Sequence, residues 1–351
     1  MKETLQFFIG IDVSKLWFDA CLLPVINQTK MPQVTERFAN DKTGMNQFDK
    51  WLKKLKVSFD DHTLLVLENT GIYHRHLWAY CSEKKLPIHI GNAAHIKWSF
   101  GIARGKNDKI DAVRLCSYGQ KCADELKATP NLNPVLLQLK DWMTARTKLL
   151  SQVNSIRTFI KELKTVNDKL VQKQLEAAHK QAIAGLLQSI KNIEAAMKKI
   201  IDENESIKIN YLLLKTVPGI GHLTAVYLIC CTNNFGGKIT GKQLACYAGV
   251  VPFESTSGIS VKGKNRVHKM ANKDLKKMLH LCALSVIRFN GEFKDYYQRK
   301  KAEGKHSMSI LNAIRNKIVL RAVAVVNNKT PYVDNTKIND KENENIFLEM
   351  S

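Results

Sequence analysis

Apolar residues separated by alternating steps of three and four run through the middle of the chain, where glycine is almost absent. This spacing is the heptad pattern of helices that bury one stripe against a partner. One seam contains Leu149, Val153, Ile156, Ile160 and Leu163, and a second contains Ile183, Leu186, Ile190, Ile193, Met197 and Ile200. We therefore expect two long helices over residues 131–211, paired either with each other as an antiparallel hairpin or with another subunit. We favour self-association through this coiled coil, as a homodimer or a homotetramer.

The residues before this segment, 1–130, alternate short apolar runs with amphipathic ones. Residues 7–13 and 17–22 are strand-like and lie close together in the chain, which predicts an opening β-hairpin. Residues 63–67 predict a fully buried strand, and helical spacing over residues 45–55 predicts a helix before it. Hairpin strands followed by alternating helices and strands predict an α/β fold with a mixed sheet.

The residues after this segment, 212–333, predict a mainly α-helical domain. Two glycines around one apolar residue, Gly219 and Gly221, precede a helical run and resemble the turn of helix-hairpin-helix modules. Backbone N–H groups at such a helix start can hold a phosphate. Amphipathic helices are expected over residues 272–289 and 307–326, and the polar residues 334–351 predict a disordered tail.

Lysine and arginine outnumber aspartate and glutamate by 54 to 32, which gives a net charge of +22. A surface of this charge attracts polyanions, so nucleic acid is the first partner expected and an acidic membrane surface the second. No apolar run reaches the roughly 20 residues of a membrane-spanning helix, and the first residues lack the apolar core of a signal peptide. The eight cysteines have neither Cys-x-x-Cys pairs nor zinc-ligand spacing, which favours reduced thiols. We expect a soluble cytoplasmic protein with no membrane partner.

Four carboxylates stand at positions where strands end or a helix begins. Asp12 ends one apolar run, Glu68 ends the predicted buried strand, and Asp108 and Asp111 lie three apart at the start of a predicted helix. Residues three apart on a helix project to the same side, so this pair can converge. A two-metal phosphoryl-transfer site needs such a set, because Mg²⁺ prefers carboxylate oxygens. Each residue also has a simpler interpretation: a strand-end acid, a solvated charge, or two acids that cap a helix.

Residues 8–15, 67–73 and 106–112, taken together, resemble the amino-terminal DEDD domain of the insertion sequence 110 family of bacterial transposases. The resemblance implies an RNase-H-like fold similar to that of the RuvC junction resolvase. It also implies that Asp12, Glu68, Asp108 and Asp111 are catalytic acids that bind Mg²⁺, with Mn²⁺ as a substitute.

A cluster of serines and threonine at residues 249–260 precedes a strongly basic segment. From composition, this is a surface loop that contacts phosphate. The carboxy-terminal domain of the same family has a Gly-x-x-Pro element followed by a Ser-Gly pair, and that match assigns the catalytic serine to Ser257. Ser255 and Ser260 are the alternatives. Basic residues expected to bind nucleic acid flank the acids and follow the serine: Arg104, Lys106, Lys109, Lys262, Lys264, Arg266, Lys269 and Lys273.

The resemblance extends over most of residues 8–333 and implies a DNA transposase that cuts and exchanges strands through a covalent serine–DNA link. It implies that the acids of one subunit and the serine of another form one site. Its implied partners are donor and target double-stranded DNA and a structured guide, the bridge RNA, in the bacterial cytoplasm at the nucleoid. Two other functions stay open: a metal-dependent junction resolvase or nuclease without a serine adduct, and an inactive nucleic-acid-binding protein.

Overall fold

The computed structural model describes residues 5–333 apart from positions 70, 101–107, 167, 252–255, 258–260, 263–266, 268–270 and 290. The chain divides into two compact units, Met1–Leu132 and Asn133–Ser351. Each unit is described by itself. Within the described residues, no helix combines the length and the apolar character needed to cross a membrane.

The amino-terminal unit is built on one mixed sheet. Its strands are β1 (Leu5–Val13), β2 (Trp17–Ile26), β3 (Thr29–Lys30), β4 (Val34–Ala39), β5 (Thr63–Glu68) and β6 (Ile88–Gly91). The order is β3-β2-β1-β5-β6, and β4 also pairs with β2. β1 and β2 form the predicted antiparallel hairpin, whereas β1 pairs with β5 and β5 pairs with β6 in parallel. The predicted α/β class with a mixed sheet is confirmed.

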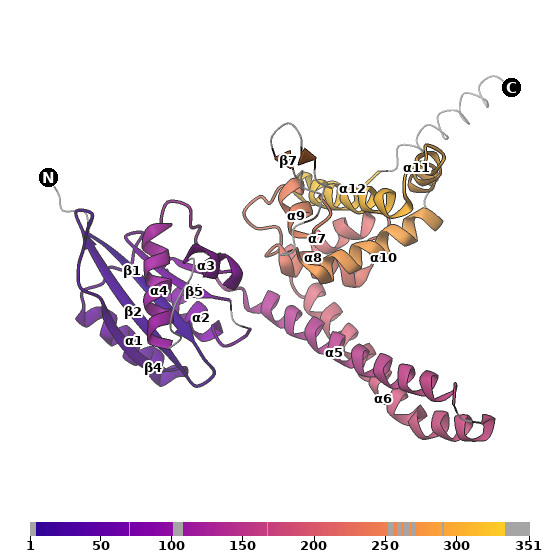
Figure 1. Ribbon diagram of the computed structural model, residues 1–351, viewed down its shortest axis with the longest axis horizontal. Coiled ribbons are helices and arrows are strands. Elements are labelled where there is room, and N and C mark those ends of the chain that lie inside the picture. The colour runs from indigo at the N-terminus through magenta and orange to yellow at the C-terminus, as the bar shows by residue number, and fades with distance from the viewer. Residues whose placement is uncertain are drawn as a thin grey trace. The chain divides into compact units, whose positions relative to one another are not determined.

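Helices cover both faces of this sheet because its central strands are apolar on both sides. α1 (Lys42–Lys54) and α2 (Arg75–Lys84) pack on one face, where Phe48 and Leu77 join Ile9 and Ile11 in a buried cluster. α3 (Ala93–Ser99) precedes α4 (Asp108–Lys121), and α4 lies across the other face (Figure 1). There Cys116 packs with residues of β1 and β2.

A single glycine sets how closely α4 approaches β1. A Cβ added at Gly10 would lie 2.0 Å from the backbone nitrogen of Cys116 and 2.2 Å from the carbonyl oxygen of Ala112, so only glycine fits. Gly119, further along α4, lies near Phe8. The helix therefore runs antiparallel to β1, and its first turn reaches the end of the strand where Asp12 lies.

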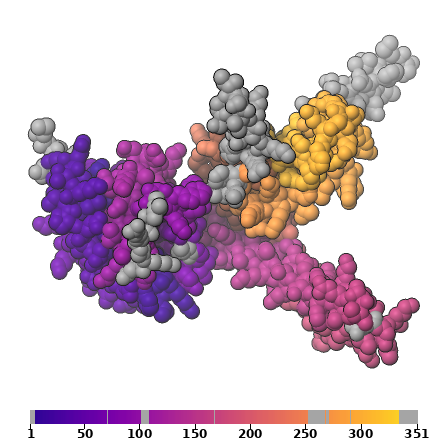
Figure 2. Space-filling model, viewed as in Figure 1, coloured from indigo at the N-terminus to yellow at the C-terminus, as the bar shows by residue number. Residues whose placement is uncertain are grey.

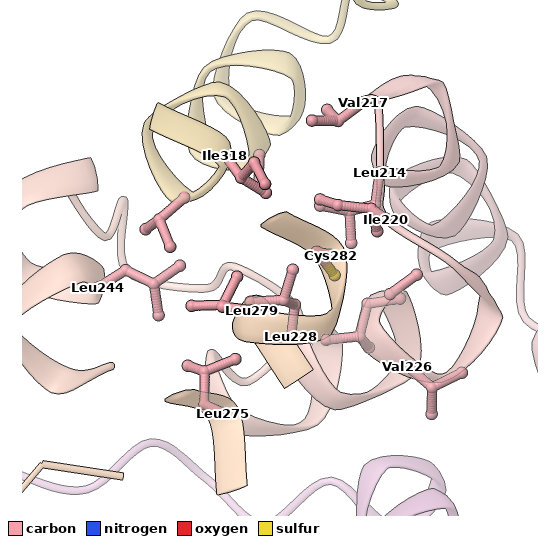
Figure 3. Packing of buried hydrophobic residues seen from close by; sticks show 14 of the residues in the cluster. Leu214, Val217, Ile220, Val226, Leu228, Leu244, Leu275, Leu279, Cys282 and Ile318 are labelled. Carbon is pink, nitrogen blue, oxygen red and sulfur yellow. The ribbon is translucent and has the colours of Figure 1, made fainter. Parts of the chain in front are cut away.

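The carboxy-terminal unit is mainly helical, as predicted. Its helices are α5 (Pro134–Leu163), α6 (Lys169–Asp202), α7 (Glu205–Thr216), α8 (His222–Cys231), α9 (Gly241–Tyr247), α10 (Lys273–Phe289), α11 (Gly291–Ala302) and α12 (Ser307–Asn328). A two-stranded pair, β7 (Thr256–Ser257) and β8 (Val261–Lys262), lies between α9 and α10 in the chain. Side chains from α7, α8, α9, α10 and α12 meet in one core, in which Leu214, Leu228, Leu279 and Ile318 are fully buried (Figure 3).

The two helices predicted from the heptads pair with each other. The ion pairs Arg146–Glu194 and Lys164–Glu176 fix an antiparallel hairpin of α5 and α6. Its base enters the core of the unit, and its outer part projects from helices α7–α12 as an arm (Figure 2). This is one of the two pairings that the sequence left open, and self-association through the helices stays a prediction. The division expected near residue 211 falls inside α7 and also stays a prediction.

The turn that resembles a helix-hairpin-helix module joins α7 to α8. Gly219 has φ +84°, and an added Cβ would lie 2.6 Å from Val286 Cγ1 and 2.9 Å from the carbonyl oxygen of Cys282. This glycine is therefore required by a left-handed backbone and by close packing on α10. Phosphate binding by the turn stays a prediction.

Candidate active site

A row of three charged residues crosses the sheet on the face that α4 covers. Asp12 on β1 is directly opposite Asp19 on β2, and Asp19 is directly opposite Arg37 on β4. Directly opposed residues have Cβ atoms about 5 Å apart, so their side chains meet. The β1–β5 register, with Ile11 opposite Leu67, brings Glu68 to the same end of the sheet.

Asp19 and Arg37 form a bidentate ion pair. Asp19 is 2% exposed, and its carboxylate accepts hydrogen bonds from Arg37 Nε at 3.0 Å and Nη2 at 2.7 Å. The guanidinium also lies 5.2 Å from the centre of the Trp17 ring. Sequence reasoning missed both charged residues. An acid inside the apolar run 17–22 was the available signal, because a buried carboxylate requires a partner.

The first turn of α4 supplies the other two acids. Arg37 Nη2 lies 3.2 Å from Asp108 Oδ2, so one guanidinium joins the buried Asp19 to the exposed Asp108. Asp111 accepts a hydrogen bond from Arg114 Nη1 at 2.8 Å. Both acids therefore have basic partners on the same side of the sheet as Asp12.

The four predicted acids are close enough to influence one another's protonation. Burial, followed in order of effect by the charges of Asp111, Asp108, Glu68 and Asp19, raises the pKa of Asp12 to about 6. Burial and then the charge of Asp111 raise the pKa of Glu68. Negative charge is therefore in excess around Asp12, although Arg37 and Arg114 offset part of it.

The site has the donor chemistry of a hard divalent cation but not a completed ligand shell. Among the residues that the structure describes, no three or more acids, histidines or cysteines converge as a metal cluster. Carboxylate oxygens are nevertheless the ligands that Mg²⁺ and Mn²⁺ select. A cation among them would offset the repulsion that raises the pKa of Asp12. The residues present therefore fit a divalent metal by charge and donor type.

Ser257 lies in the other unit, on β7, where it is opposite Val261 of β8. Lys262 ends β8, and Lys273 is the first residue of α10. Lys109 is exposed on α4. The remaining predicted site residues lie outside the part of the chain that the structure describes: Arg104, Lys106, Ser255, Ser260, Lys264, Arg266 and Lys269.

The two ends of the segment that carries Ser257 are held together. Gly249 has φ +64°, and an added Cβ would lie 2.4 Å from the Cβ of Ala271. The Asn272 backbone N–H donates to the carbonyl oxygen of Tyr247 at 2.8 Å. Asn312 on α12 donates from Nδ2 to the carbonyl oxygen of Val250 at 2.7 Å. The segment therefore leaves the helical core and returns to it at one place, beside α10 and α12.

Comparison with known proteins matches two parts of the chain to transposases. A model of the DEDD transposase domain of IS110 elements, described as "Transposase", matches residues 9–167, which contain all four acids. A model described as "Transposase IS116/IS110/IS902 family" matches residues 211–298, which contain Ser257.

Individual relatives agree with these matches. The chain is 29% identical to the pilin gene-inverting proteins of Moraxella lacunata and Moraxella bovis, over 93% of this chain and 97% of theirs. It is 31% identical to an uncharacterized 43.6 kDa protein of insertion element IS110 from Streptomyces coelicolor, over 30% of this chain and 26% of that protein.

Proposed function

The chain belongs to the IS110 family of transposases, which are DNA recombination enzymes, and from that premise we propose that it exchanges DNA strands with a metal-dependent acid site and a serine nucleophile. The observation that carries the proposal is the gathering of Asp12, Glu68, Asp108 and Asp111 at one end of the sheet, with the pKa of Asp12 raised to about 6. Four acids that repel one another in a folded protein are retained where a cation or a phosphate reaction needs them.

The acids would hold Mg²⁺, with Mn²⁺ as a substitute. A divalent ion there would supply positive charge to the phosphate oxygens of a DNA strand and favour ionisation of the attacking group. The residues of the chain prepare the site in two ways. The Asp19–Arg37 ion pair joins β2 to β4 beside Asp12, and the close packing at Gly10 fixes the start of α4.

Ser257 would be the nucleophile. Its Oγ would attack a phosphodiester, forming a serine–phosphate ester while the bond from phosphorus to one DNA oxygen breaks. The leaving strand would keep that oxygen as a free hydroxyl and take up one proton, equal to the one that the serine loses. Attack by the hydroxyl of an exchanged strand would reverse the reaction and restore the serine. Lysines that follow the serine in the chain, such as Lys262 and Lys273, would stabilise the additional negative charge.

A structured guide RNA would select the donor and target duplexes. The support is the resemblance to guided members of the family and a net charge of +22 spread along the chain. A protein that leaves sequence recognition to base pairing contacts mainly backbones, for which diffuse positive charge is sufficient. The Moraxella relatives are named pilin gene-inverting proteins, and this name extends the proposal to DNA inversion. The same exchange between two sites of one DNA molecule would invert the segment between them.

The test uses the purified full-length protein with Mg²⁺, matched donor and target duplexes, and RNA transcribed from the DNA that flanks the gene. A denaturing gel detects a covalent protein–DNA species. We expect an adduct that requires RNA and Mg²⁺, is absent in Ser257→Ala and Asp12→Asn, and persists in Ser255→Ala and Ser260→Ala. Cut ends without an adduct would instead assign the chain to the resolvase or nuclease class.

A further inference from the structure

Arg315 on α12 is a buried cation. It is 4% exposed, and its Nη2 donates to Nδ1 of His280 on α10 at 2.7 Å. The buried Nε has no hydrogen-bond partner, and no carboxylate forms an ion pair with Arg315 among the described residues. Charged groups are rarely buried without an opposite charge, because they lose their hydration.

Two half-buried basic side chains, one turn apart on the same side of α10, accompany this guanidinium. His280 must accept at Nδ1, because a guanidinium has only donors, and its proton is therefore on Nε2. Lys276 lies one turn earlier on α10, and burial followed by the charge of Arg315 lowers its pKa. The cluster thus offers donors from Arg315, His280 and Lys276 and lacks a negative charge. Donors of this kind, arginine above all, match phosphate oxygens.

The cluster lies where the Ser257 segment joins the helical core. Asn312, one turn before Arg315 on α12, holds the carbonyl of Val250 at the start of the segment. Asn272, one turn before Lys276, directly precedes α10 at the end of the segment and donates hydrogen bonds to Tyr247. The cluster is therefore anchored to the same two helix turns as both ends of the segment.

We propose that Arg315, His280 and Lys276 form a binding site for a backbone phosphate of the DNA strand on which Ser257 acts. The site would hold a phosphate next to the attacked one and so position the strand. This inference rests on the proposed function, since it takes Ser257 as the residue that meets DNA. An internal partner is the competing explanation, and residues 251–270 contain one acid, Glu254, against four lysines and arginines.

The test measures DNA binding by the full-length Ser257→Ala protein. Because this variant lacks the proposed nucleophile, a change in affinity reports on the phosphate site and not on strand cleavage. Lys276→Met and Arg315→Gln are compared with Lys277→Met, an exposed neighbour that pairs with Asp274 at 3.5 Å. We expect the first two to weaken binding by about tenfold and to reduce the slope of log K against log salt by about one, as for one lost phosphate contact. Lys277→Met should change neither quantity by as much.

Neutral methylphosphonates placed singly along the duplex then identify the phosphate. One position near the cleavage site should weaken binding about tenfold in the Ser257→Ala protein and have no further effect when Lys276→Met is added. Equal effects of Lys276→Met and Lys277→Met, or no sensitive position, would overturn the inference. So would a loss of thermal stability in Glu254→Gln equal to that in Arg315→Gln, because the partner would then be a carboxylate of the chain. Serine adducts in the unmodified protein report separately on the proposed function.

Discussion

At Asp12, burial and charge act in the same direction. Burial is the larger cause and four neighbouring carboxylates add to it, so the pKa rises from 3.8 to about 6. An acid whose pKa is higher in the folded state than in the unfolded chain costs stability above both values and nothing below both. The folded state should therefore lose stability as the pH rises from about 4 to about 6 in the absence of metal.

We predict that Asp12→Asn stabilises the metal-free protein at pH 8. A shift from 3.8 to about 6 corresponds to at most about 3 kcal/mol, and the amide removes this cost. The measurement is calorimetric unfolding of the full-length chain in EDTA at pH 8 and pH 4. The gain should disappear at pH 4, where the carboxyl of the unmodified protein is already protonated. Equal changes at both pH values would show that Asp12 is not electrostatically strained.

A second prediction concerns metal binding itself. Mg²⁺ or Mn²⁺ should raise the melting temperature of the amino-terminal unit, because a ligand that binds only the folded state stabilises it. The increase should be larger at pH 8 than at pH 5, since a proton on Asp12 competes with the metal. Asp12→Asn should remove the increase, and Asp274→Asn, an exposed acid of the other unit, should leave it unchanged. A metal effect that survives Asp12→Asn would place the ion elsewhere.

Arg37 gives a third prediction. Asp19 is almost completely buried and depends on the two hydrogen bonds from this guanidinium. Arg37→Met should leave a buried carboxylate without its cation and lower the melting temperature of the amino-terminal unit by roughly 5 °C or more. Arg37→Lys should recover only part of the loss, because an ammonium group cannot form the bidentate pair. Lys53→Met is the control: it removes an exposed lysine from Asp49, which keeps its hydrogen bond from Tyr80, so the loss should be smaller.

Among individual residues, those predicted from the sequence are the ones that a local pattern identifies. Asp12 and Glu68 end apolar runs, and Asp108 and Asp111 begin a helix, so strand and helix periodicity places them. Asp19 and Arg37 were missed because their pairing depends on the register of β2 and β4, which no local pattern specifies. No local pattern marks Arg315, because its burial follows from packing between α10 and α12.

At the scale of elements, the contact of α4 with β1 depends on Gly10. Gly10→Ala would place a methyl group about 2 Å from the α4 backbone, which a helix cannot relieve by a side-chain rotation. We predict a loss of about 3 kcal/mol and weaker metal binding, since Asp108 and Asp111 are on the displaced helix. Gly185→Ala on α6 is the opposite case, because an added Cβ there would have no other atom within 4 Å. It should stabilise the hairpin by about 0.5–1 kcal/mol. Thermal unfolding of both variants measures these two changes in stability. A Gly10→Ala protein as stable as the unmodified chain would contradict the prediction.

The hairpin of α5 and α6 shows what periodicity specifies and what it leaves open. The heptads identified both helices, and predicted seam residues such as Val153, Ile160 and Ile190 are buried. The same apolar stripe would serve a partner helix from the same chain or from another subunit, so the pattern cannot select the partner. Selection comes from the short link between the helices and from ion pairs such as Arg146–Glu194.

At the scale of the whole molecule, the candidate acids and the candidate serine are on different units, which meet in the chain at Leu132 and Asn133. A site that needs both groups can be formed by one chain or by two. Family resemblance favours two, with the acids of one subunit and Ser257 of another. This choice cannot be predicted from residue patterns, because either arrangement uses the same residues.

Mixing two inactive variants distinguishes the arrangements. In a dimer with shared sites, a heterodimer of Asp12→Asn and Ser257→Ala has one site with intact acids and an intact serine and one with neither. Random mixing makes half of the dimers heterodimers, so roughly a quarter of the sites should form adducts. If each site comes from one chain, every site in the mixture has a defect and no adduct forms. Asp12→Asn mixed with Glu68→Gln is the control, since both changes damage the acids and no combination restores them. Adduct formation is the measurement to use, because it reports single sites, whereas complete strand exchange requires several sites to act together.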